Sequence, residues 1–355
     1  MKIVLDTHAH TIVSGHAYNT IREMAQMAKE KGLEAFALTE HAPQMPGTCH
    51  EFYFQNLHIV PREMYGVRLF MGVELNIMNE KGEVDLPEST LCQMDIAIAS
   101  IHGPCYKGER TEEAITAAYL AAMENPLIHI IGHPDDGRYP VDYEQLAKKA
   151  KETGTVLEVN NGSLRPGGFR VDTRKNDLKM LEYCKKYEVP VTMGSDAHMD
   201  VDLADYSYAL PVIEESHFPE ELIVNTSAEL LKSCIQYKRN MWKQKKITNA
   251  NFSDLCRIAL LADYGGLWID ATVFLTGKID EKILQSDIFF YQASFLDMTV
   301  TKVSNWFMYA KNPDNYFMCS LKESMINYWL NNKHMDDYFI FHINFLCCES
   351  NLICL

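Results

Sequence analysis

The stretch KIVLDTHAH (residues 2–10) begins as an apolar run and ends in two histidines, and this pattern recurs along the chain. Similar runs that end in histidine or a carboxylate follow as EAFALTEH (34–41), RLFMGVE (68–74), DIAIASIH (95–102), LIHIIGH (127–133) and VPVTMGSDAH (189–198). Buried parallel strands typically read as short apolar runs of this kind. The pattern therefore predicts a series of buried strands, each with a potential metal ligand at its carboxyl end.

Amphipathic stretches separate these runs. Apolar residues recur at helical spacing in TIREMAQMAKEKG (20–32), TEEAITAAYLAAMEN (111–125), DYEQLAKKAKETG (142–154) and RKNDLKMLEYCKKY (174–187). Two of these four stretches end in glycine, which often terminates helices. A chain that repeats strand, loop and helix most simply closes into a barrel, with functional residues at the carboxyl ends of its strands. We therefore expect an α/β barrel in which distant segments meet at one rim.

Nine residues with metal-ligand chemistry lie at or just after the apolar runs. They are His8, His10, His16, His41, Glu74, His102, His133, Asp196 and His198. His8 and His10 are two residues apart, so both rings leave the same face of an extended chain and can bind one ion. Imidazoles with few carboxylates suit zinc, manganese or iron, whereas calcium and magnesium prefer oxygen-rich sites. Seven histidines and two carboxylates exceed the needs of one ion, so this set predicts a polynuclear site.

A single histidine at a strand end is more often a hydrogen-bonded loop residue than a metal ligand. The set is more informative, because seven of the 13 histidines in the chain end apolar runs or follow them closely. His129 lies inside its apolar run, so we expect it in the core or behind the ligands. His50, His58 and His217 lie in irregular or polar surroundings and are excluded from the predicted site.

The chain carries an ordered series of short motifs: DTHAH (6–10), GHAY (15–18), TEH (39–41), GVE (72–74), IHG (101–103), GHP (132–134) and GSDAH (194–198). This series resembles the polymerase and histidinol phosphatase (PHP) superfamily, and the resemblance covers residues 1–236. It implies a distorted seven-stranded (βα) barrel with the activity of a metal-dependent phosphatase. Many relatives have TDH where this chain has TEH, but Glu40 is not an expected ligand.

The resemblance also implies a trinuclear site, with zinc as the expected metal and manganese or iron as alternatives. The ligands would fall into three groups: His8, His10, Glu74 and Asp196 for the first ion; Glu74, as a bridge, with His102 and His133 for the second; His16, His41 and His198 for the third.

Phosphate ester hydrolysis is the reaction that such a site would support. Divalent ions lower the pKa of bound water from about 15.7 toward about 7 and neutralise phosphate oxygens. The expected nucleophile is a metal-bound hydroxide, since no Ser-His-Asp or Cys-His arrangement points to a side chain. The expected catalytic residues are Glu74 and Asp196. Glu74 is the bridging ligand. Asp196 is, like metal-bound water, a candidate to protonate the leaving group.

Several other polar residues are candidates for supporting roles. The arginines that could steer a phosphate are Arg62, Arg138, Arg165 and Arg170, the last two in the glycine-rich loop SLRPGGFR (163–170). A solvated loop is the alternative for each arginine. Asn160 and Asn161 follow the apolar run VLEV (156–159), and we expect them to lie behind the ligands.

Composition limits the classes of partner. A formal net charge of -15 argues against nucleic acid or an anionic membrane as the main partner, since both require a basic face. The opening MKIVLD lacks the apolar core of a signal peptide, and no apolar run is long enough to span a bilayer. Ten cysteines without regular spacing are expected to be reduced. We therefore expect a cytoplasmic enzyme that acts on a small phosphate ester.

The character of the chain changes near residue 236, and aromatic residues become more frequent beyond Asn249. Residues 237–355 are therefore expected to form a second unit. Its most informative segment, NFSDLCRIALLADYGGLWIDATVFLTG (251–277), predicts three features: a helix start at Ser253 and Asp254, a helix stop at Gly265 and Gly266, and a buried strand over 267–274 that carries Asp270.

This segment resembles glycosyltransferases of the capsular-polysaccharide type. In that family a carboxylate at the position of Asp270 helps to hold a divalent ion against a nucleotide-sugar. The family usually shows two carboxylates and a longer fold, so we expect residues 237–355 to be an incomplete α/β transferase fragment. The closing FLCCESNLICL (345–355) is expected to be a cut-off or out-of-frame terminus.

Three functions stay open from the sequence. The first is hydrolysis of a phosphate monoester by the barrel, which the full ligand set favours. The second is sugar transfer from a nucleotide-sugar by the C-terminal unit, which would depend on Asp270. The third is a metal-binding scaffold without turnover, in which the ions only stabilise the barrel.

Overall fold

The computed structural model describes residues 1–244, 249–271, 273–292, 303–331, 341 and 345. From its sequence, FLCCESNLICL (345–355) is expected to be a cut-off or out-of-frame terminus. Apart from Phe345, this segment lies outside the described residues. The chain divides into two compact units, Met1–Trp242 and Lys243–Leu355. The predicted boundary after residue 236 falls within helix α8 (Ala228–Gln244), which the two units share.

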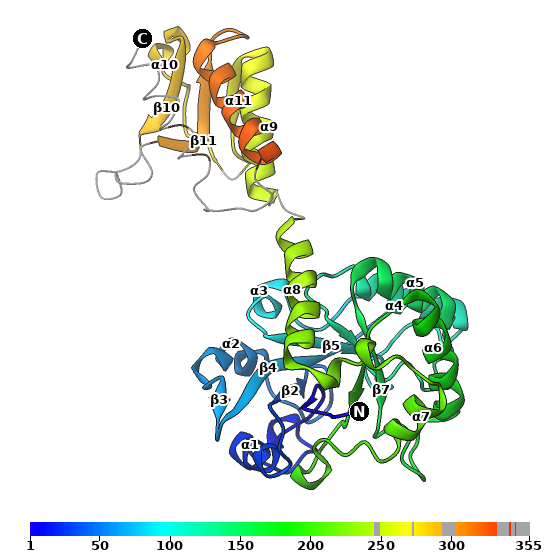
Figure 1. Cartoon of the computed structure of the whole chain (residues 1–355). Helices are drawn as coiled ribbons and strands as arrows, with labels where there is room; N and C mark the ends of the chain where they lie inside the picture. The colour runs from blue at the N-terminus through cyan, green and yellow to red at the C-terminus, as the bar shows by residue number, and fades with distance from the viewer. Residues whose placement is uncertain (245–248, 272, 293–302, 332–340, 342–344, 346–355) are drawn as a thin grey trace. The chain divides into compact units, whose positions relative to one another are not determined.

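The first unit is a barrel of parallel strands surrounded by helices (Figure 1). Its strands pair in the order β1-β2-β4-β5-β6-β7-β8, and β3 is an antiparallel addition to β4. The strands are β1 (Leu5–Asp6), β2 (Ala35–His41), β3 (Glu63–Met64), β4 (Val67–Asn76), β5 (Ile96–Ser100), β6 (Ile130–Ile131), β7 (Val156–Asn160) and β8 (Val191–Gly194). The expected seven-stranded (βα) barrel is confirmed.

Helices pack around this barrel and cover its outer surface (Figure 1). They are α1 (Ile21–Glu30), α2 (Glu51–Gln55), α3 (Glu88–Leu91), α4 (Glu112–Met123), α5 (Tyr143–Thr153), α6 (Thr173–Tyr187), α7 (Ala209–Glu215) and α8. The four helices predicted from apolar spacing are α1, α4, α5 and α6. A capping box between Thr20 and Glu23 starts α1, and Gly154, with its left-handed backbone, ends α5.

The first and last strands of the barrel are joined at their carboxyl ends by the segments that carry predicted ligands. The backbone N–H of Asp196 donates to the carbonyl of His8, and the N–H of His10 donates to the carbonyl of Ala197, each at 2.9 Å. Ala9 and Ala197 form the parallel bridge between these segments. The two ends of the barrel sequence therefore meet at the predicted metal site.

At the opposite end, a side chain fills the gap between β1 and β8. The amide of Asn225, in the 3-10 turn Val224–Thr226, is fully buried. Its Oδ1 accepts from the backbone N–H of Met193 at 2.6 Å, and its Nδ2 donates to the carbonyls of Leu5 and Met193 at 3.1 and 2.8 Å. Asn225 thus replaces backbone hydrogen bonds that a continuous pair of strands would make.

Helix α8 closes the bottom of the barrel with apolar side chains. Leu231 and Ile235 pack in one core cluster with residues from the beginnings of the strands, among them Leu5, Ile96 and Val156. The barrel interior is therefore apolar at the amino ends of the strands.

The described residues of the second unit form a three-stranded antiparallel sheet with helices packed against it. Its strands pair in the order β10-β11-β9, and α9 and α11 share a core with the sheet. The elements are α9 (Asn249–Tyr264), β9 (Gly266–Ile269), α10 (Glu281–Gln285), β10 (Ile288–Gln292), β11 (Val303–Ala310) and α11 (Tyr316–Asn331).

The structure corrects two predictions in this unit. The predicted helix start at Ser253 and Asp254 is wrong, because both residues lie within α9. The predicted buried strand is also wrong in part: among the described residues β9 is a short edge strand that pairs only with β11, and its residues are partly exposed. The stop at Gly265 and Gly266 is confirmed. Among the described residues of the chain, every helix is too short or too polar to cross a bilayer.

His129 is buried in the core at the lower part of the barrel, one of its two expected positions. Its Nδ1 accepts a hydrogen bond from the backbone N–H of Ala97 at 3.0 Å. Burial lowers its pKa to about 3, and the nearby Arg239 and Lys238 act in the same direction. The folded protein therefore holds His129 neutral at a pH where the unfolded chain would protonate it.

Replacement of Asn225 by alanine should destabilise the barrel by roughly 3 kcal/mol, since each buried backbone group left without a partner costs about 1–3 kcal/mol. Urea unfolding followed by circular dichroism measures this loss. Gln26→Ala removes an amide from the exposed face of α1 and should change stability by less than about 0.5 kcal/mol. Equal stabilities of the two variants would contradict the role given to Asn225.

Acid should destabilise the fold through His129. The folded-state pKa lies below the unfolded value of about 6.5, so its contribution is complete above pH 6.5 and falls as pH decreases toward 3. One proton corresponds to a slope of at most about 1.4 kcal/mol per pH unit. His129→Gln should reduce the pH dependence of the unfolding free energy by up to this slope between pH 6.5 and 4. Parallel curves for the variant and the wild type would refute the effect.

Candidate metal centre

The carboxyl ends of the strands bring all nine predicted residues to one rim of the barrel. His41 and Glu74 lie within β2 and β4, and the others follow strands or the first 3-10 turn. Distances between their side chains link them into one continuous cluster. The register of the parallel strands places His41 directly opposite Glu74. The convergence expected from the sequence is therefore present in the fold.

Glu74 occupies the centre of this cluster and is fully buried. Its Oε1 lies 2.9 Å from His133 Nε2 and 3.2 Å from His102 Nε2. Its Oε2 lies 2.7 Å from His41 Nδ1 and 3.4 Å from His8 Nε2. Burial raises the pKa of Glu74, but the surrounding imidazoles outweigh burial and hold the pKa well below its usual value. Glu74 is therefore an ionised carboxylate that faces several histidines at once.

Asp196 is the second carboxylate of the cluster. Its Oδ1 lies 3.3 Å from His10 Nε2 and 3.6 Å from His8 Nε2. Burial raises the pKa of Asp196, but His8, His10 and nearby cations outweigh it and hold the pKa well below its usual value. The backbone of Asp196 has a φ of 55°, and that of His133 a φ of 31°. Such left-handed conformations are strained for residues other than glycine, and they often occur at functional sites.

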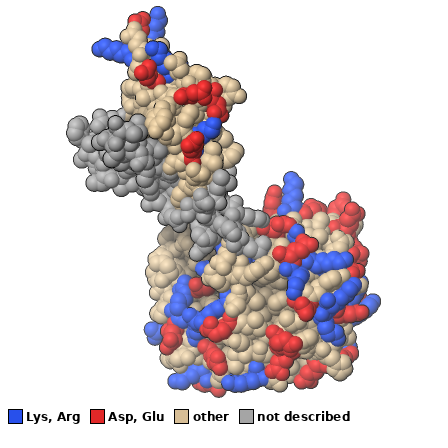
Figure 2. Space-filling model, turned by 45° about the horizontal axis from the view of Figure 1, so that its top comes forward, with Lys and Arg blue, Asp and Glu red and all other residues tan. Residues whose placement is uncertain are grey.

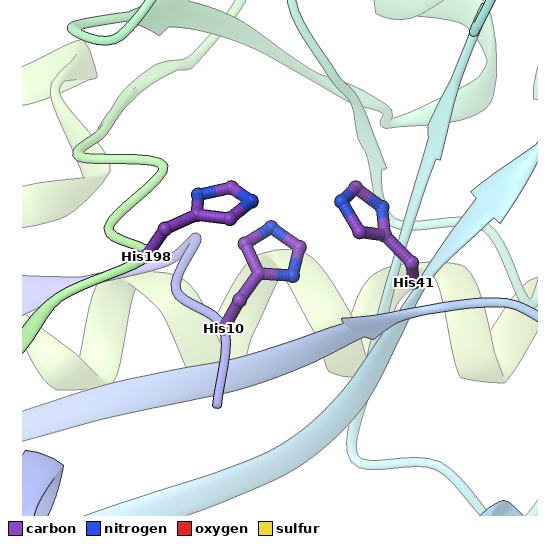
Figure 3. A group of neighbouring side chains, drawn as sticks. All are labelled: His10, His41 and His198. Atoms are coloured by element: carbon purple, nitrogen blue, oxygen red, sulfur yellow. The ribbon is translucent and has the colours of Figure 1, made fainter. Parts of the chain in front are cut away.

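Three groups of side chains have ligand atoms that all lie within 4.8 Å of one another. They are His10, His41 and His198; His8, His10 and Glu74; and His41, Glu74 and His102. Figure 3 shows the rings of the first group turned toward a common point.

His16 lies at the outer side of the cluster and is exposed. Its ring centroid is 4.9 Å from that of His41 and 4.7 Å from that of His198. It belongs to none of the three groups formed by described residues, whereas His10 does. The rings of His10 and His16 therefore both lie beside those of His41 and His198, although the family resemblance would give only His16 to this group.

Four buried atoms in the cluster have no hydrogen-bond partner: His8 Nε2, His10 Nε2, His41 Nδ1 and Glu74 Oε2. Each of the three nitrogens lies 2.7–3.6 Å from the same Glu74 oxygen. Unpaired polar atoms are costly in a protein interior. Imidazole nitrogens and carboxylate oxygens that face one another in this way fit a site for divalent metal ions.

The protonation of the histidines is consistent with metal binding. Burial lowers the pKa of His102 to about 4 and holds that of His10 well below its usual value. Both rings are thus neutral near pH 7, as metal ligands must be. The pKa of His8 differs from these. Burial lowers it, but the negative charges of Glu158, Glu74 and Asp196 outweigh burial and raise it well above its usual value.

Glu40 stabilises the loop that carries His10 and His16. Its carboxylate accepts hydrogen bonds from the hydroxyls of Thr11 and Ser14, at 2.5 and 2.6 Å. The Ser14 hydroxyl in turn lies 3.2 Å from His10 Nδ1 and accepts from the backbone N–H of His41 at 3.0 Å. Glu40 therefore supports the loop from behind.

The two asparagines after β7 have different surroundings. Asn160 lies behind the cluster, as expected, and its Nδ2 donates to Asp196 Oδ2 at 3.3 Å. Asn161 does not, because its Oδ1 accepts from the backbone N–H groups of Tyr208 and Ala209 at the start of α7. Asn161 thus organises a helix end.

Only some of the arginines approach the cluster. Arg62 pairs with Asp95, and Arg138 pairs with Asp136, so neither faces it. Arg165 and Arg170 line a cavity of about 380 Å³ together with His16, His41, His102, Asp196 and His198.

Arg170 is the more buried of these two arginines. Its Nη1 donates to the Ser163 hydroxyl at 2.6 Å and lies 3.5 Å from Asp196 Oδ2. A positive charge therefore borders the cavity close to Asp196.

Sequence reasoning missed several buried carboxylates, of which Glu158 is closest to the ligands. Its Oε1 lies 2.7 Å from His8 Nδ1. The signal was a charged residue inside the apolar run VLEV (156–159), because a buried carboxylate requires partners.

Asp270 of the second unit is already engaged by other side chains. Its Oδ1 accepts from Trp268 Nε1 at 2.8 Å and lies 3.1 Å from Arg257 Nη1. Arg257 also pairs with Asp254, whose pKa is raised by burial to about 6. The carboxylate expected to hold an ion against a nucleotide-sugar is thus paired with an arginine here.

Known proteins match both parts of the chain. Residues 6–164 match the family model of the PHP domain, and residues 233–353 match that of the capsular polysaccharide synthesis protein. A probable phosphatase of Caldanaerobacter subterraneus subsp. tengcongensis is 42% identical over 243 residues, which cover 67% of this chain and 93% of the relative. A probable phosphatase of Caldicellulosiruptor saccharolyticus is 45% identical over 229 residues, or 64% of this chain and 94% of the relative.

Among solved structures, the chain resembles histidinol phosphate phosphatase of Lactococcus lactis subsp. lactis in complex with zinc, L-histidinol and phosphate. That similarity covers 61% of this chain and 94% of the other, with 19% identity and a TM-score of 0.44. The family assignment rests on the sequence matches to the two probable phosphatases, which are 42% and 45% identical and are covered over 93% and 94% of their length. The chain belongs to the PHP family, among relatives that are probable phosphatases.

Proposed function

We propose that the barrel, residues 1–236, hydrolyses a small phosphate monoester with three divalent metal ions. Zinc is the proposed metal, with manganese or iron as alternatives. The observation that carries this proposal is the set of buried, unpartnered ligand atoms that face one another around Glu74. Family membership supports the same reaction class.

The nine rim residues would hold the ions. Glu74 would bridge two ions, because its two oxygens face different histidines: Oε1 faces His102 and His133, and Oε2 faces His8, His10 and His41. His10 lies close enough to His41 and His198 to share in the third group beside His16. When bound, such ions would lower the pKa of water and neutralise phosphate oxygens.

The side chains around the cavity have separate roles in this proposal. Arg170, and Arg165 at the more exposed side, would attract and orient the phosphate group. Asp196 borders the cavity, and its low pKa keeps it ionised near neutral pH. It therefore suits a ligand and proton acceptor better than the proton donor to the leaving group.

The cavity favours a small-molecule substrate. Its volume of about 380 Å³ is at the lower end of typical ligand sites. Acidic and basic side chains are intermixed over the face of the first unit visible in Figure 2.

Reconstitution with zinc or manganese should give about three ions per chain by elemental analysis, and the loaded protein should hydrolyse p-nitrophenyl phosphate. The double variant His102→Ala/His133→Ala removes two imidazoles that face Glu74 Oε1, so hydrolysis should fall by at least about a hundredfold. The matched control His58→Ala/His217→Ala removes two exposed histidines and should retain wild-type activity.

Two results would contradict the proposal. Full activity in His102→Ala/His133→Ala would show that the rim does not perform the reaction. Stoichiometric metal binding that raises the melting temperature, without turnover of any phosphate monoester, would support the scaffold alternative.

A further inference from the structure

Glu158 is a buried carboxylate that contacts the metal-centre residues from below. It lies in β7, its side chain is fully buried, and it accepts three hydrogen bonds. Oε1 pairs with His8 Nδ1 at 2.7 Å, and Oε2 accepts from the backbone N–H of His133 at 2.9 Å and from Asn160 Nδ2 at 3.0 Å. One carboxylate therefore connects the segments after β1 and β6 with the end of β7.

The fold leaves space for this carboxylate through a glycine in β8. A Cβ atom at Gly194 would lie 1.9 Å from Glu158 Oε1. Gly194 does not have a positive φ, so its backbone does not require glycine. Glycine at this position is explained by the close approach of neighbouring side chains, of which Glu158 is the nearest.

We propose that Glu158 is a positioning residue of the metal centre. This proposal rests on the proposed function insofar as His8, His133 and Asp196 are taken as metal ligands. A carboxylate at 2.7 Å accepts the Nδ1 proton of His8, which fixes the ring and leaves the lone pair of Nε2 free. That nitrogen is the buried, unpartnered atom that faces Glu74 and Asp196.

The same carboxylate also orders two further ligands. His133 has a left-handed backbone with φ of 31°, and Glu158 holds the N–H of this strained residue. Asn160 donates one hydrogen bond to Glu158 and another to Asp196 Oδ2 at 3.3 Å, so it connects the two carboxylates. Glu158 thus positions His8 directly, His133 through its backbone and Asp196 through Asn160.

Glu158→Gln tests this role with almost no change in volume. If the amide oxygen faces His8, the amide NH₂ opposes two donors, His133 N–H and Asn160 Nδ2. If the NH₂ faces His8, Nδ1 must accept, and the proton moves to Nε2, which then cannot bind a metal. Both orientations should weaken metal binding, and loss of such a partner typically lowers metal affinity 10–100-fold.

The measurements are zinc affinity by chelator competition, zinc stoichiometry, and ¹⁵N shifts of the His8 ring in metal-free protein at a pH high enough for this ring to be neutral. We expect the neutral wild-type ring to carry its proton on Nδ1, and Glu158→Gln to bind zinc at least tenfold more weakly. Glu158→Asp retains the charge but is too short to reach all donors, so it should give a smaller loss. It also provides a second test should Glu158→Gln fail to fold.

Asp177→Asn is the matched control, since Asp177 is equally buried and neither of its oxygens has a hydrogen-bond partner. It should retain wild-type zinc affinity. Wild-type affinity in Glu158→Gln, an equal loss in Asp177→Asn, or a wild-type His8 proton on Nε2 would each overturn the proposal. The ring shifts need neither bound metal nor turnover, so they test Glu158 even where the wild type fails to bind zinc or hydrolyse phosphate.

Discussion

A single buried negative charge, that of Glu74, is the constraint around which the upper half of the barrel is arranged. An ionised carboxylate without water is strongly unfavourable unless it is paired. Here the strands surround it with imidazoles from four other segments, and two of these rings, His8 and His41, each have a buried nitrogen without a hydrogen-bond partner. Divalent cations satisfy both needs, because they compensate the charge and accept the lone pairs.

The barrel divides its interior between stability and chemistry. Apolar side chains from the strand starts pack against α8 at one end, and Asn225 supplies the hydrogen bonds missing between β1 and β8. The polar cluster occupies the other end. Glu158 lies between the two layers, at a level where the strand sequence changes from apolar to ligand residues. This separation allows the lower end to stabilise a strained and highly charged upper end.

Much of the first unit could be predicted from the sequence, because its signals are local. Apolar runs located the parallel strands, helical spacing located α1, α4, α5 and α6, and the position after each strand identified the rim residues. The two-residue strand β3 and the short helices α2 and α3 were not predicted, since such elements depend on neighbours more than on their own pattern.

The relations among side chains were harder to predict. Sequence does not show that His10 faces His41 and His198, or that Asn161 turns to α7, because both depend on the closed barrel. In the second unit the apolar run around Asp270 suggested a buried strand, but in the part of the chain that the structure describes β9 is an edge strand with a partner on one side only. Apolar composition alone does not distinguish these environments.

The seam between the first and last strands has a consequence for the order of events during synthesis. His8 and His10 come before the barrel strands β2 to β8, whereas Asp196 and His198, and Asn225 below them, come almost a full barrel later in the chain. Contacts between such distant segments form late in folding. During synthesis His8 and His10 are therefore made well before their partners, and the complete set of donors exists only after the last strand has been added.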